Sequence, residues 1–121
     1  NVLEEVINML FYIAEADGNV STSELEMIES ISGIFGLSNV QFESIKESRK
    51  LSEKSNPYII LESNPKDDIQ SIRKKYIKLS KEHHPDLLIS KGVPKEVIEE
   101  SKKKMRAINS AWDQIQKLKS N

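Results

Sequence analysis

The chain has 121 residues, enough for one domain or two very small ones. Hydrophobic residues make up 37% and charged residues 31%, the balance of a soluble globular protein rather than a disordered one. The lack of cysteine excludes disulfides, thiolate nucleophiles and cysteine-based zinc sites, and no apolar run approaches the roughly 20 residues that span a bilayer.

The net charge of −1 conceals an uneven distribution. Residues 1–53, the acidic half, carry ten acids and three bases, a balance of −7. Residues 54–121, the basic half, carry nine acids and fifteen bases, a balance of +6. This division predicts two units that have different partners or that attract one another. One alternative is that the acidic half folds back and masks the basic half.

The acidic half begins with two helices joined by a turn. Apolar residues at three- and four-residue steps predict a helix over residues 2–14, and residues 17–19 (Asp-Gly-Asn) end it because all three favour turns. Ser21 and Glu24 have the spacing of a capping box and open a second helix, which Gly36 stops.

A third helix and a linker complete this half. Ser38 and Gln41 repeat the capping-box spacing, and the helix that they open is predicted to reach about Ser52. Residues 52–55 are polar, with no apolar anchor, and are the best linker candidate.

The basic half is also helical. Asn56 as N-cap and Pro57 at the first helical position open a short helix through Leu61. Asp68 caps a helix that runs to about Glu82, and Pro85 forbids its continuation. A loop then leads to a last helix over residues 95–118. No segment reads as a strand, so we expect an all-α fold.

The helix over residues 68–82 has one apolar and one basic side. Its apolar side holds Ile69, Ile72, Tyr76 and Leu79. The rest of the surface carries bases and no acid between residues 69 and 81: Arg73, Lys74, Lys75, Lys78 and Lys81. A solvated face is the ordinary interpretation of a charge run, but a single sign is better suited to steering toward an acidic partner.

The tetrapeptide His83-His84-Pro85-Asp86 follows this helix directly. A His-Pro-Asp string is weak by itself, but it stands here between a basic amphipathic helix and a second long antiparallel helix. The strings at 57–61, 72–79 and 108–112 occur in the same order as in the J domain of the DnaJ family, which residues 55–118 therefore resemble. Ile77, Leu87 and Trp112 depart from the family's usual residues.

The resemblance implies an antiparallel hairpin of helices 68–82 and 95–118. It further implies a co-chaperone, not itself an enzyme, that stimulates the ATPase of a DnaK-type heat-shock chaperone without a cofactor. The partner-binding residues that it implies are His84, Pro85, Asp86, Arg73, Lys74, Lys78 and Lys81. The predicted core is Tyr58, Leu61, Ile69, Ile72, Tyr76, Leu79, Met105, Ile108, Trp112 and Ile115. His83 is expected to have no task.

Two further segments resemble the DjlA-like branch of this family. The loop at 87–96 contains the Gly-x-Pro of that branch, and residues 16–24 resemble the Ala-Asp-Gly turn of TerB-like helical domains. We therefore expect residues 1–53 to be the C-terminal part of a TerB-like domain, an interaction module whose partner is unknown. The chain lacks an initiator methionine and is expected to be a piece of a longer, cytoplasmic protein, with any membrane anchor lying upstream.

Metal binding is considered at the first turn. Residues 17–24 also fit positions five to twelve of an EF-hand loop, but the first position, which needs a carboxylate, falls on Ile13. We favour a capped helix–turn–helix there, with Asp17 and Glu24 as weak metal candidates. Two adjacent histidines without a third nearby ligand also make a poor zinc site.

Nucleic-acid binding is the second function considered. Lys74, Lys78 and Lys81, together with the lysines at 102–104, have the charge to meet phosphates. Because exposed aromatic residues for stacking are missing and the chain is slightly acidic, we expect no nucleic-acid partner.

Overall fold

The computed structural model describes residues 2–50 and 54–120, with the backbone alone for Val2 and Asp17. Every regular element among these residues is a helix, which confirms the predicted all-α class. In chain order the elements are α1 Val2–Ala14, η1 Glu15–Asp17, α2 Thr22–Ile34, α3 Asn39–Ser48, α4 Pro57–Ile60, α5 Ile69–Glu82, α6 Pro85–Ile89 and α7 Lys95–Lys119. None of the described helices has the length and apolar character that a membrane span requires.

Side-chain caps set where several helices begin. At the start of α2, Ser21 Oγ accepts from the Glu24 amide at 3.1 Å, and the Glu24 carboxylate accepts from the Ser21 amide at 2.9 Å. Ser38 and Gln41 form the same reciprocal pair at the start of α3. The Asp68 carboxylate accepts an amide hydrogen from the first turn of α5. The predicted starts of these three helices are confirmed.

The third helix ends sooner than predicted. It stops at Ser48 rather than Ser52, because the amides of Arg49 and Lys50 bond to carbonyls three residues back, at 3.2 and 3.1 Å. Such bonds tighten the last turn into a 3-10 form that does not continue as an α-helix. Half of the predicted linker, residues 52 and 53, lies outside the described part of the chain.

The loop expected after Glu82 contains a further helix. Pro85 does not continue α5, but it occupies the first turn of α6, where its missing amide hydrogen costs nothing. His84 is the N-cap of α6, and its Nδ1 accepts from the Asp86 amide at 3.2 Å. The His-Pro-Asp tripeptide therefore opens a short helix instead of lying in an irregular loop.

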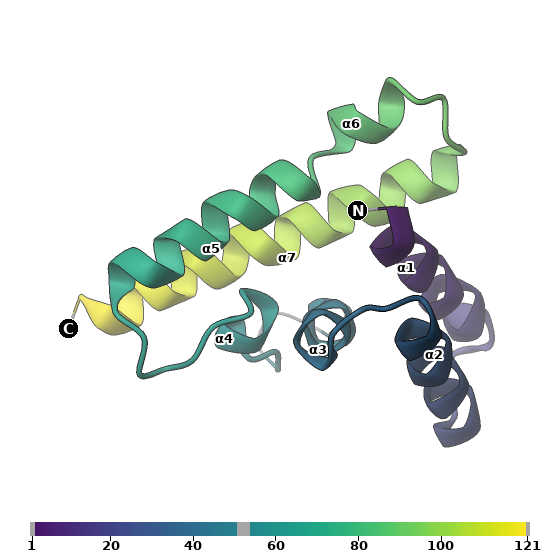
Figure 1. Cartoon of the computed structure of the whole chain (residues 1–121), viewed down its shortest axis with the longest axis horizontal. Helices are drawn as coiled ribbons and strands as arrows, with labels where there is room; N and C mark the ends of the chain where they lie inside the picture. The colour runs from purple at the N-terminus through teal and green to yellow at the C-terminus, as the bar shows by residue number, and fades with distance from the viewer. Residues whose placement is uncertain (1, 51–53, 121) are drawn as a thin grey trace.

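The basic half is built around an antiparallel pair, α5 and α7, with α4 packed against α7 (Figure 1). Tyr76 of α5 stacks on Trp112 of α7, with ring centroids 5.2 Å apart and planes 10° from parallel. Its buried core is Ile60, Leu61, Ile72, Leu79, Ile108, Ala111 and Ile115, with Tyr58, Ile69, Tyr76, Met105, Ala107 and Trp112 packed around it. All ten predicted core residues belong to this cluster, and Ile60 and Ala111 are buried members that the prediction missed.

The acidic half forms a second, smaller core between α1, α2 and α3. Its buried members are Ile7, Phe11, Ile28, Phe42 and Ile45. Phe11 of α1 and Phe42 of α3 bring their ring centroids within 6.0 Å. A core of this size is marginal by itself, so the packing of this half against its neighbour matters for its stability.

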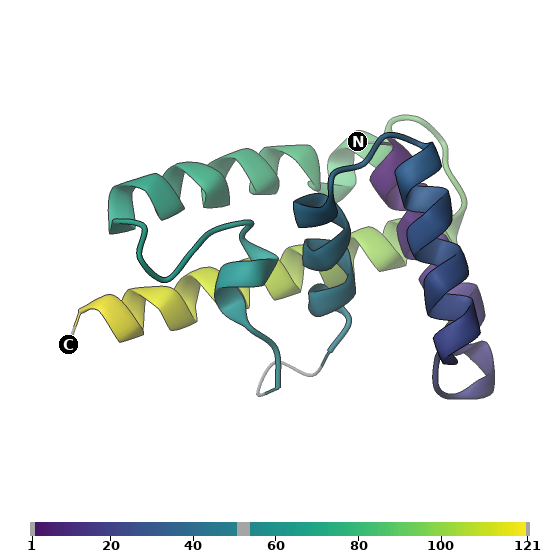
Figure 2. The ribbon, with the colours of Figure 1, turned by 60° about the horizontal axis from the view of Figure 1, so that its bottom comes forward.

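The two halves dock through α7 and α4. α1 and α3 pack against α7, and α3 also packs against α4 (Figure 2). α5 packs along α7, and in the described part of the chain it does not pack against α1, α2 or α3. Ser44 Oγ of α3 donates to the Ile60 carbonyl of α4 at 2.6 Å, which ties the two cores together. Among the described residues, α7 and α4 are therefore both packed against helices of the two halves.

Candidate partner-binding site

The predicted basic face exists as an exposed surface of α5. All five of its bases, Arg73, Lys74, Lys75, Lys78 and Lys81, are exposed. An ion pair on this face, between Lys78 and Glu82, spans 4.0 Å at the surface and contributes little to stability. Because the acidic half docks on α7 and α4, the alternative that it masks this face is wrong.

The His-Pro-Asp tripeptide stands at the C-terminal end of that face. The His84 and Asp86 side chains are 54% and 83% exposed, so both are available to a partner. Because His84 Nδ1 accepts from the Asp86 amide, we assign the ring hydrogen to Nε2. An open hollow of about 440 Å³ here is lined by Ser80, Lys81, His84, Asp86 and Leu87.

His83 fixes the base of the tripeptide. Its amide donates to the Leu79 carbonyl at 3.0 Å, and its carbonyl accepts from Ser101 Oγ of α7 at 2.9 Å. Its ring is 1% exposed and lies 3.6 Å from the carboxylates of Glu4 and Glu5 in α1. His83 is therefore not a free loop residue, because α1 covers its side chain, and this structural role was not predicted from the sequence.

Arg49 joins the acidic half to α7. Its Nε and Nη2 donate to the Glu15 carboxylate at 2.9 and 2.7 Å, and its Nη1 donates to Glu100 at 2.8 Å and to Asn8 at 3.3 Å. Burial disfavours the charged guanidinium, but the hydrogen bonds to Glu15 and Glu100 outweigh it and raise the pKa of Arg49. The interface thus contains a charged group that stays charged.

Lys104 of α7 is buried in the same interface. Its Nζ donates to Ser44 Oγ at 3.0 Å and to Ser48 Oγ at 2.8 Å, both on α3. Burial lowers the pKa of Lys104 to about 8, although nearby carboxylates, Glu4 foremost, oppose the shift. The alternative in which residues 102–104 present lysines to phosphates is therefore wrong for Lys104.

The turn between α1 and α2 holds the two weak metal candidates. The Glu24 carboxylate caps α2, and its hydrogen bonds with Ser21 lower the pKa of Glu24. The Asp17 side chain lies outside the described part of the structure. Gly18 has a φ of 115°, a conformation that glycine adopts readily and that lets the chain turn here. The capped helix–turn–helix interpretation is confirmed.

Sequence reasoning missed the charged residues of the interface, although a signal was present. Glu100 and Lys104 precede Ile108, Ala111 and Ile115 at steps of four, four, three and four residues. That spacing places all five on one face of α7, the face that is buried. Charged residues at the same helical spacing as an apolar stripe therefore indicate that further helices cover this end of the helix too.

Two family models match the chain, one in each half. The model described as "Tellurite resistance protein TerB" matches residues 1–47, and the model described as "DnaJ domain" matches residues 56–120. The second match covers more than half of the chain. No solved structure matches it.

Several curated proteins named "Co-chaperone protein DjlA" are similar to the chain. The protein from Vibrio parahaemolyticus is 34% identical over 89 residues, which cover 72% of this chain and 31% of that protein. The protein from Mannheimia succiniciproducens is 44% identical over 62 residues (51% and 22%), and the one from Salmonella typhimurium is 28% identical over 128 residues (88% and 47%). The chain thus spans less than half of each relative. It belongs to the DnaJ-domain family, in the DjlA-like arrangement in which a TerB-like region precedes the J domain.

Proposed function

We propose that this chain is a co-chaperone unit that stimulates ATP hydrolysis by a DnaK-type heat-shock chaperone. One observation carries the proposal: the His-Pro-Asp tripeptide, with His84 and Asp86 exposed, lies at the end of an exposed face of α5 whose charged residues between positions 69 and 81 are all basic. The relatives' name, co-chaperone, supports it. Hydrolysis belongs to the partner, and this chain supplies recognition.

The roles of the individual groups follow from their chemistry. Lys74, Lys78 and their neighbours on α5 attract an acidic surface of the chaperone. The exposed Asp86 carboxylate accepts hydrogen bonds from a basic side chain of the partner. The exposed His84 ring donates its Nε2 hydrogen to an acceptor oxygen of the partner. Pro85 restricts the backbone of the turn, which reduces the entropy lost when the partner binds.

We also propose that residues 1–53 and 54–121 are two units with separate partners in the cytoplasm. The acidic half is then an interaction module that leaves the tripeptide accessible. Its exposed apolar side chains, Ile13, Met27 and Ile34, support a role in binding.

Single-turnover ATPase assays with a DnaK protein test the main proposal. His84→Gln and Asp86→Asn should each abolish the stimulation while circular dichroism shows unchanged helix content. Asp113→Asn, the same change at a 63% exposed position of α7, is the matched control and should stimulate like the wild type. Equal stimulation by the wild type and both tripeptide variants would rule the proposal out.

A further inference from the structure

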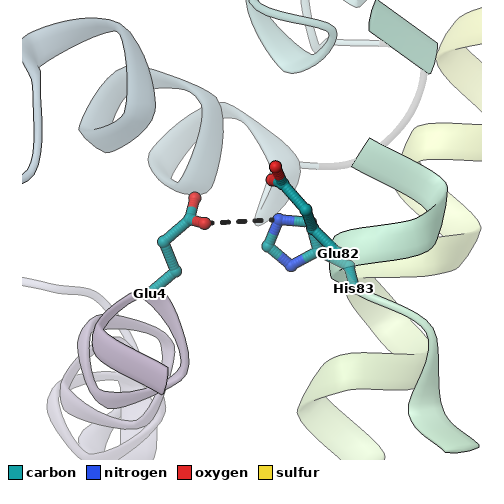
Figure 3. Close-up of side chains that lie close together, drawn as sticks. All are labelled: Glu4, Glu82 and His83. Atoms are coloured by element: carbon teal, nitrogen blue, oxygen red, sulfur yellow. Dashed lines mark ion pairs between the residues drawn. The ribbon is translucent and has the colours of Figure 1, made fainter. Parts of the chain in front are cut away.

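The junction between α1 and the C-terminal end of α5 buries an unusual group of ionisable side chains. Glu4, Glu5 and His83 are 1%, 6% and 1% exposed. Figure 3 shows Glu4 reaching from α1 toward the imidazole of His83, with the Glu82 carboxylate beside the ring. Glu4 belongs to α1, whereas Glu82 and His83 are the last residue and the C-cap of α5, so only the fold brings Glu4 to the other two.

Several atoms of this group lack a hydrogen-bond partner within the described part of the chain. They are Glu4 Oε2, Glu5 Oε2, His83 Nδ1 and His83 Nε2. His83 Nε2 lies 3.6 Å from Glu4 Oε2, and His83 Nδ1 lies 3.6 Å from Glu5 Oε1. Both distances are longer than the roughly 2.7–3.2 Å of a good hydrogen bond. Buried polar atoms without partners are rare in proteins, and a bound ion is one of the reasons for them.

The spacing suits metal coordination. One possible ligand atom from each of Glu4, Glu82 and His83 lies within 4.8 Å of the other two. Two ligands of a tetrahedral zinc ion, each about 2.05 Å from the metal, lie about 3.4 Å apart. The separation of 3.6 Å between His83 Nε2 and Glu4 Oε2 is close to this value.

We propose that Glu4, Glu82 and His83 bind a zinc ion at this junction. The mixed set of one imidazole nitrogen and two carboxylates suits Zn²⁺, whereas Ca²⁺ and Mg²⁺ prefer oxygen ligands throughout. Glu82 has a side chain that is 36% exposed and also lies 4.0 Å from Lys78, so its side of the site is open to a water molecule as fourth ligand.

Glu5 completes the arrangement. With the metal on Nε2 of His83, the ring hydrogen belongs to Nδ1, which faces Glu5 Oε1. Zinc-bound histidines commonly donate their other ring hydrogen to a carboxylate, which fixes the orientation of the ring. The ion would join α1 of the acidic half to the residue that directly precedes His84, so the TerB-like region and the tripeptide would share one anchor.

The test uses the whole chain, freed of metal by a chelator and titrated with zinc chloride. Isothermal titration calorimetry should show one zinc ion per chain, and the melting temperature should rise with added zinc. Glu82→Gln, at the most exposed ligand, keeps the buried part of the junction and should weaken zinc binding at least about tenfold. Glu4→Gln should weaken it similarly.

Two controls locate the ion. Glu99→Gln, at an exposed acid of α7, and His84→Gln, at the exposed histidine, should both bind zinc as tightly as the wild type. The proposal is overturned if zinc neither binds in the calorimeter nor raises the melting temperature. It is also overturned if Glu82→Gln and Glu4→Gln bind like the wild type, because the ion then sits on other surface groups.

Discussion

α5 and α7 are both lysine-rich, but the structure uses their charges in opposite ways. On α5, Lys74 and Lys78 are exposed, and α7 covers the apolar side of that helix. On α7, Lys104 and Glu100 are buried, and they bond to residues of α3 and its C-cap. The charge of a helix therefore does not determine whether its lysines are exposed to another protein or buried against other helices of the same chain. The number of faces that other helices cover determines this, since α5 is covered on one side and α7 on two.

Removing the central arginine of the buried network should have the largest effect. Arg49→Ala leaves the Glu100 carboxylate, whose side chain is 1% exposed, without its main partner. Breaking a buried ion pair in this way costs about 3–5 kcal/mol of unfolding free energy. Urea unfolding followed by circular dichroism measures the loss.

Arg73→Ala on the exposed face of α5 is the matched control for this change. It should alter the unfolding free energy by no more than about 0.5 kcal/mol. If both substitutions cost the same, the contrast between the two helices does not hold.

The buried lysine should make stability depend on pH. In the folded chain the pKa of Lys104 is about 8, against 10.5 as its ordinary value. Between these pH values the unfolded chain binds more protons, so the unfolding free energy should rise with pH, by on the order of 3 kcal/mol in all. Unfolding series from pH 7.5 to 10.5 on the wild type and Lys104→Met isolate this rise, which the variant should lack.

Lys74→Met on α5 is the control, and its unfolding free energy should follow the wild type at every pH. A constant difference between the wild type and Lys104→Met across this range would show that folding does not lower the pKa of Lys104.

A smaller loss is expected at the hydroxyl that links the two cores. Ser44 Oγ donates to the Ile60 carbonyl and accepts from Lys104 Nζ. Ser44→Ala leaves both groups buried with fewer partners, which should cost about 1–3 kcal/mol. Ser30→Ala, at an exposed position of α2, should change the unfolding free energy by less than about 0.5 kcal/mol, and a similar result at Ser44 would show that this hydroxyl does not hold the halves together.

The smallest effect on stability, and a large one on binding, is expected on the basic face. Lys74→Glu with Lys78→Glu should change the unfolding free energy by about 0.5 kcal/mol or less per site. The double variant should bind a DnaK protein more weakly, and added salt should weaken the wild-type complex as exposed charges are screened. Lys102→Glu with Lys117→Glu on α7 makes the same charge change and should bind like the wild type. Wild-type affinity that ignores salt would contradict steering by α5.

Most of the helices could be predicted because their signals are local. Ser21 with Glu24 and Ser38 with Gln41 are capping pairs three residues apart, and both form as expected. The apolar positions of α5 and α7 predicted the core of the basic half for the same reason. The end of α3 was placed too late, because no residue before Lys50 signals that its last turn tightens.

The sequence by itself determined the all-α class and the place of His84, Pro85 and Asp86 after a basic helix. These features depend on periodicity and on neighbours within a few residues. The antiparallel α5–α7 pair was implied by the resemblance to J domains. Only the tertiary structure decided that Arg49 meets Glu100, 51 residues further along, and that α1 buries His83 against Glu4. Such contacts depend on which helix faces are covered. In this chain helices of both halves pack against α7, so Glu100 and Lys104 of α7 are buried and bind within the molecule. The bases of α5 stay exposed and are available to a partner.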